Sequence, residues 1–105
     1  MVVGNQFWIS GQLSVGADGG TLPRSARQKA ARAFAHGFCI AEAAGFARTD
    51  SVYVDVAFID LADVKDVNVL FAELFAEGSR PARTIYQAAR LPFDGCIKVQ
   101  VVAAR

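Results

Sequence analysis

The 105-residue chain is predicted to fold as an α+β domain, with two helices packed on one face of a single mixed sheet. Two segments with apolar residues at three- and four-residue spacing indicate helices, and four segments rich in β-branched and aromatic residues indicate strands. Their order is β, α, β, α, β, β. Because 53% of the residues are hydrophobic, the chain can bury a core, and its length predicts one domain over residues 1–105.

The first half of the chain begins with a strand from Asn5 to Val15, broken by a glycine, and a glycine-rich loop from Val15 to Pro23. A helix is expected from Ser25 to Ala44, closed by Gly45 in a left-handed conformation. Its small residues predict a close approach to the sheet. The apolar face of this helix consists of Ala26, Ala30, Ala33, Phe34, Gly37, Phe38, Ala41 and Ala44.

The second half continues with a strand from Ser51 to Leu61 and a helix that Asp63 can cap and that runs to about Glu77. Gly78 is expected to end this helix. Two further strands, Pro81 to Ala89 and Cys96 to Ala103, are separated by a turn from Leu91 to Gly95.

Charge and composition exclude several classes of function. The chain has 11 Lys and Arg against 10 Asp and Glu, so it lacks the basic excess of a nucleic-acid binder. It has neither an apolar run of about 20 residues nor the start of a signal peptide, which predicts a cytoplasmic protein without membrane contact. His36 and Cys39 are two potential ligands where zinc requires four, so no metal site is expected.

Alternation along the last two strands suggests a binding face. Ile97, Val99 and Val101 share one side and can join the core, while Cys96, Lys98 and Gln100 lie opposite. If these strands are neighbours, the face away from the helices would gather four polar residues beside an exposed Ile85, and other subunits would cover it. These four residues are Arg83, Gln87, Lys98 and Gln100.

Arg83 is the main candidate on this face. A guanidinium can hold a carboxylate with two hydrogen bonds, and Arg83 at a subunit boundary could anchor an acid substrate. The ordinary alternative is an interfacial or surface ion pair.

Several short motifs resemble, in order and spacing, those of the Rid/YjgF family, the reactive intermediate deaminases that are also called L-PSP-type endoribonucleases and translation inhibitors. The resemblance extends from about Val3 to Ala104. The motifs are Ser10-Gly11-Gln12, Glu42-Ala43-Ala44-Gly45, Val67-Asn68 with Phe71 and Phe75, Pro81-Ala82-Arg83, and Arg90-Leu91-Pro92.

The resemblance implies a chorismate mutase-like fold with a six-stranded sheet, assembled as a homotrimer whose sheets form an inner barrel with ligand clefts between subunits. The implied activity needs no metal or cofactor: water attacks 2-iminobutanoate or 2-iminopropanoate and releases ammonia and a 2-keto acid. Carried over by motif, Arg83 would clamp the substrate carboxylate, and Ser10, Gly11 and Ile85 would line the cleft. Asn68 would be structural.

Two departures from the family pattern leave the function open. The family's glutamate in the last strand falls on Lys98, and its second glutamate falls on Gln100. An earlier Gly-Pro-Tyr-type motif, whose tyrosine closes the cleft, is also missing.

Two readings therefore carry equal weight: an imine deaminase with a modified site, and a non-catalytic trimer that binds a small carboxylate or another anion. A Lys98 Schiff base with a keto acid is a third alternative. The near-neutral charge and the lack of a catalytic histidine pair argue against a ribonuclease.

Overall fold

The computed structural model describes residues 1–13, 26–75, 77–78 and 80–105, and it contains one six-stranded sheet. The sheet has the order β1-β2-β6-β4-β5, and β3 pairs with β6 beside β2. Only β4 and β5 run parallel, so the sheet is mixed. The strands are β1 (Val2–Val3), β2 (Gln6–Trp8), β3 (Gln12–Leu13), β4 (Ser51–Phe58), β5 (Ala82–Gln87) and β6 (Ile97–Ala104).

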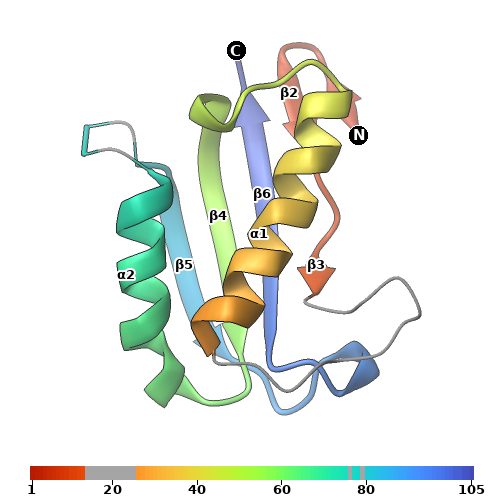
Figure 1. Cartoon of the computed structure of the whole chain (residues 1–105). Coiled ribbons are helices and arrows are strands. Elements are labelled where there is room, and N and C mark those ends of the chain that lie inside the picture. The colour runs from red at the N-terminus through yellow and green to blue at the C-terminus, as the bar shows by residue number, and fades with distance from the viewer. Residues whose placement is uncertain (14–25, 76, 79) are drawn as a thin grey trace.

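Both helices, α1 (Ala26–Ala43) and α2 (Val64–Leu74), lie on the same face of the sheet (Figure 1). The α+β class and the one-sided helix layer are therefore confirmed. The core lies between this layer and the sheet, where Phe34, Val54 and Ile97 are completely buried.

Helix α1 approaches the sheet closely because its inward face carries small side chains. Ala30 and Ala33 are fully buried, and a Cβ atom placed on Gly37 would lie 3.6 Å from the Cγ2 atom of Val101 on β6. The predicted close approach is confirmed. Gly45 follows the helix with a φ of +85°, the left-handed conformation expected there.

The ends of α2 differ from the prediction. Asp63 makes no side-chain cap; instead the Asp60 carboxylate accepts a 2.9 Å hydrogen bond from the Ala62 backbone and caps a short 3₁₀ turn, Leu61–Asp63, that precedes the helix. The helix ends at Leu74, before the expected Glu77, because Phe75 adopts an extended backbone. This conformation brings the Phe75 ring into the core against the rings of Phe34, Phe38 and Phe71.

The N-terminal strand is shorter and more divided than predicted. Ile9, Ser10 and Gly11 separate β2 from β3, and β1 adds a short strand that the sequence analysis did not identify. The predicted loop from Val15 to Pro23 lies outside the described residues. The turn from Leu91 to Gly95 is confirmed as a 3₁₀ turn, Pro92–Asp94, with Phe93 at a φ of 58°.

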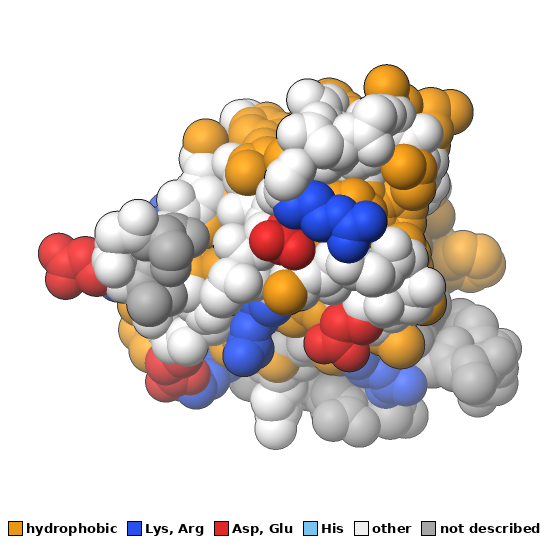
Figure 2. Space-filling model, turned by 90° about the horizontal axis from the view of Figure 1, so that it is seen from above, with side chains coloured by type: hydrophobic (Ala, Val, Ile, Leu, Met, Phe, Trp, Pro, Cys, Tyr) orange, Lys and Arg blue, Asp and Glu red, His pale blue; other side chains and the backbone are white. Residues whose placement is uncertain are grey.

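The apolar character of the helices and the distribution of charged side chains can be read from the structure. Among the described residues, no helix is both long enough and apolar enough to cross a bilayer. Seen from above, basic and acidic side chains are interspersed, and neither sign forms a continuous patch on this side of the molecule (Figure 2).

The close contact between α1 and the sheet predicts a strong dependence on side-chain volume. Ala33→Leu should lower the free energy of unfolding by about 1–3 kcal/mol, because its extra atoms meet a packed interface. Ala35→Leu makes the same change at an exposed position of α1 and should alter it by less than about 0.5 kcal/mol. Urea denaturation measures both, and equal losses would contradict the close packing.

Candidate functional site

Arg83 lies on β5 at one edge of the sheet, and its side chain is on the helix side. It is in register with Val54 of β4, which is buried in the core beneath the helices. The guanidinium carbon of Arg83 lies 4.5 Å from the centroid of the Phe71 ring on α2. Ile85, two residues further along β5, faces the same side and packs against the core.

The predicted gathering of Arg83, Gln87, Lys98 and Gln100 on one face is therefore wrong for a single copy of the chain. The last two strands are not neighbours, because β4 lies between β5 and β6. Ile97, Val99 and Val101 are buried on the helix side, which places Lys98 and Gln100 on the opposite face of the sheet. Ile85 is partly buried in the core and is not part of an exposed surface on that opposite face.

Arg83 borders a hollow of about 430 Å³ between α2 and the start of β5. No acidic side chain of the described residues lines it, and Arg83 forms no hydrogen bond or ion pair with any of these residues. A second cation, Arg80, donates a 3.4 Å hydrogen bond from Nε to the Phe75 carbonyl. The lining residues are Asn68, Phe71, Ala72, Arg80, Pro81 and Arg83.

The environment of Arg83 favours an anionic ligand. Partial burial lowers the pKa of the Arg83 guanidinium from its ordinary value, because desolvation disfavours the charged form. Arginine nevertheless stays protonated in proteins, so this is a partly desolvated cation without a counter-ion in the described chain. A bound carboxylate would supply both the charge and the two acceptors that a guanidinium fork needs.

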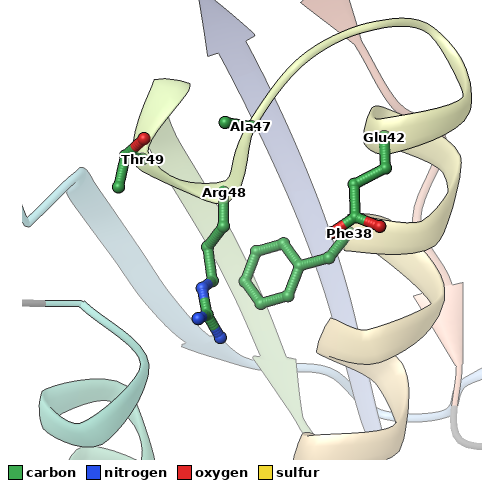
Figure 3. A pocket seen from close by; sticks show the side chains of 5 residues that line it. All are labelled: Phe38, Glu42, Ala47, Arg48 and Thr49. Atoms are coloured by element: carbon green, nitrogen blue, oxygen red, sulfur yellow. The ribbon is translucent and has the colours of Figure 1, made fainter.

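Another hollow of about 430 Å³ lies where the end of α1 faces the 3₁₀ turn Arg48–Asp50. Glu42 and Arg48 both point toward the Phe38 ring (Figure 3), and the Arg48 guanidinium carbon lies 5.6 Å from its centroid. This hollow contains its own acid, so an anion near Arg48 would also meet the Glu42 carboxylate. The hollow beside Arg83 is the better anion site.

The remaining predicted site residues lie together on the other face of the sheet, which the helices do not cover. The side chain of Lys98 passes so close to Gly11 that a Cβ atom there would lie 2.9 Å from the Lys98 Cδ atom. Ser10 precedes this glycine and is exposed, and its carbonyl accepts a 3.0 Å hydrogen bond from Gln12 Nε2. Within one copy, the predicted residues thus form two groups, Arg83 with Ile85 and Ser10 with Gly11 and Lys98.

Asp55 is a candidate that the sequence analysis missed. It lies on the same face as Lys98, on the neighbouring strand β4, in register with Gln100. Its Oδ1 atom is buried and has no hydrogen-bond partner among the described residues. The available signal was an aspartate in the middle of a central strand otherwise rich in β-formers, a position that acidic residues rarely occupy.

His36 and the two cysteines each lie in a different environment. The Nδ1 atom of His36 lies 3.1 Å from the Leu13 carbonyl, and Cys39 is exposed on α1. Cys96 is half-buried, and its sulfur accepts a 3.1 Å hydrogen bond from Lys29. Within the described ranges, no three His, Cys, Asp or Glu side chains group closely enough to hold a metal ion.

Comparisons with known proteins agree with this architecture. The family model described as Endoribonuclease L-PSP matches residues 1–105. The 2-iminobutanoate/2-iminopropanoate deaminase of Escherichia coli K12 is 33% identical over 105 residues, which cover 98% of this chain and 82% of that protein.

Solved structures show the same similarity. RidA from the Antarctic bacterium Psychrobacter sp. PAMC 21119 superposes with a TM-score of 0.90 at 31% identity, covering 100% of this chain and 85% of that one. Escherichia coli TdcF with bound serine superposes with a TM-score of 0.89 at 28% identity, covering 100% and 84%. With a family match over its whole length and a relative at 33% identity, this chain belongs to the Rid/YjgF family of L-PSP-type proteins.

Proposed function

We propose that this protein is a hydrolytic deaminase of small 2-imino acids and their enamine tautomers, such as 2-iminobutanoate and 2-iminopropanoate. The observation that carries the proposal is the Arg83 guanidinium, which lies on the Phe71 ring beside a hollow whose described lining has no acidic side chain. Such a group can hold the carboxylate that all these substrates share. The relative at 33% identity is named for this reaction.

The proposed site requires two copies of the chain. Arg83 and Lys98 lie on opposite faces of one sheet, so one copy cannot bring both to the same small ligand. We propose a homotrimer in which Arg83 and Ile85 of one copy face Ser10, Gly11 and Lys98 of the next. The uncovered face of the sheet, opposite α1 and α2, would then meet the edge of a neighbouring copy that carries β5 and α2 (Figure 1).

The proposed reaction consumes only water. The water oxygen forms a bond to the imine carbon, the electron pair of the C=N bond moves to nitrogen, and a proton passes from the water to that nitrogen. The hydroxyl proton of the resulting carbinolamine then passes to nitrogen, the C–N bond breaks as the C=O bond of the 2-keto acid forms, and ammonia leaves. By holding the carboxylate, Arg83 would fix the position of the imine carbon relative to the water and so reduce the entropic cost of the attack.

A different group must accept the proton from water if Lys98 replaces the family glutamate. A protonated lysine is a poor base. Asp55 lies on the same face and has a buried carboxylate oxygen without a partner in the described chain, so we assign it as the candidate proton acceptor.

The alternative function is a trimer that binds a small carboxylate, or another anion, without converting it. Lys98 favours this alternative, because a second cation near the ligand strengthens anion binding without activating water. A measurement of imine hydrolysis distinguishes the two functions, because only the deaminase would accelerate it.

The deaminase proposal is tested with 2-iminobutanoate generated from threonine by a threonine dehydratase. The protein should accelerate the decay of the imine, and Arg83→Gln should reduce this acceleration at least about 100-fold, because it removes the carboxylate anchor. Arg48→Gln is the matched control: it also removes an arginine beside a phenylalanine ring, but in the other hollow, and it should retain activity. No acceleration over buffer by the unmodified protein would leave only the binding function.

The residue at position 98 should control turnover. Lys98→Glu restores the carboxylate of the family pattern and should raise the rate of imine hydrolysis at least about tenfold, because a glutamate can accept the proton from water. Lys98→Gln, which removes the ammonium without adding a base, is the control for charge alone. An equal rate for both variants would contradict the assignment of Lys98 to the glutamate position.

The Phe71 ring should contribute to carboxylate binding. Phe71→Leu removes the ring beneath the guanidinium and should weaken the binding of 2-oxobutanoate about two- to fivefold, as expected for an exposed cation–π contact of about 0.5–1 kcal/mol. Phe75→Leu changes a neighbouring core ring that does not line the hollow and should leave the affinity nearly unchanged. Isothermal calorimetry measures both, and equal affinities would remove the ring contact from the site.

A further inference from the structure

We infer that the hollow beside Arg83 accepts a small dicarboxylate: a 2-imino acid, or its 2-keto product, with a second carboxylate at the far end of its carbon chain. The inference rests on the proposed function for the first carboxylate, which Arg83 would hold. The inference adds a second carboxylate to the substrate, and Arg80 would bind this distal carboxylate. The observation behind it is that two arginines, Arg80 and Arg83, line the same hollow.

The chain holds these two arginines in a fixed relation. They are separated by Pro81 and Ala82, and Pro81, whose ring restricts the backbone φ, is itself buried. The Arg80 side chain is further restrained by its hydrogen bond from Nε to the Phe75 carbonyl. That contact uses one of five guanidinium N–H groups and leaves the others available for a ligand.

The charge of the hollow agrees with a dianion. Among the described residues, its lining contains two arginines, the neutral amide of Asn68 and apolar groups, and no acid. Glu73, which follows Ala72 of the lining, forms an ion pair with Arg27. A ligand with one carboxylate would leave the second cation without a counter-ion, whereas a dicarboxylate would neutralise both.

The walls of the hollow leave room for such a ligand. Its volume of about 430 Å³ is within the usual range for small-molecule sites, and one side remains apolar through Phe71, Ala72 and Pro81. A short hydrocarbon chain can lie on this side while its two ends meet the arginines. The hollow beside Arg48 has one arginine, and it has Glu42 where the hollow beside Arg83 has a second arginine. A variant at Arg48 therefore serves as a control for the variants at Arg80 and Arg83.

The inference is tested by calorimetry with two stable keto acids, 2-oxobutanoate and 2-oxoglutarate, which share the 2-keto acid group and differ in the distal carboxylate. The unmodified protein should bind 2-oxoglutarate about tenfold more tightly, because a second charge-assisted contact forms. Arg80→Gln should remove this preference and leave the affinity for 2-oxobutanoate unchanged. Arg83→Gln should weaken both ligands, and Arg48→Gln should change neither.

The outcomes separate this inference from the proposed function. Equal affinity for the two keto acids, or an unchanged preference in Arg80→Gln, would overturn the inference, while imine hydrolysis would still support the deaminase. A preference removed by Arg80→Gln in a protein that hydrolyses no imine would support the dicarboxylate site and refute the deaminase. Tighter binding of inorganic phosphate than of either keto acid would overturn the assignment to a dicarboxylate.

Discussion

The close packing of α1 against the sheet is the constraint on which the rest of this structure depends. Ala30, Ala33 and Gly37 let the helix backbone approach β6, and the rings of Phe34 and Phe38 fill the space toward α2. Since both helices lie on one face, every strand residue belongs either to the core or to the uncovered face. The chemistry of the molecule is divided by this alternation, with Arg83 on one side and Lys98 with Asp55 on the other.

Arg83 combines features that a purely structural arginine rarely shows together. It lies on an aromatic ring, it is partly desolvated, and no described carboxylate neutralises it. An anion bound in this hollow would supply the counter-ion that no described residue provides.

The sequence was sufficient for the elements of the fold but not for their order in the sheet. Spacing of small and apolar residues located α1, and β-branched residues located β4, β5 and β6, since these signals are local. The position of β4 between β5 and β6 depends on pairing between residues distant in sequence, which no local pattern encodes. The expectation that Arg83 and Lys98 share a face failed for this reason.

The ends of helix α2 differ from the prediction because they depend on which side chains find a partner or a place in the core. The sequence analysis named only Asp63 as the cap, but the backbone path brings the Asp60 carboxylate to the Ala62 amide instead. Helix α2 ends early because burial of the Phe75 ring outweighs one more helical turn. Strand alternation and the family motif both pointed to Arg83, whereas Arg80 was identified only in the structure, where both arginines line one hollow.

The location of β5 has a consequence for the handling of this protein. It is an outer strand, so the backbone N–H and C=O groups along its free side have no partner strand in the described chain. Such an edge can recruit strands from other molecules and start aggregation, and charged side chains at the edge oppose this process. Arg83 therefore stands at a position where one positive charge would serve two roles: the binding of an acid and the solubility of the edge.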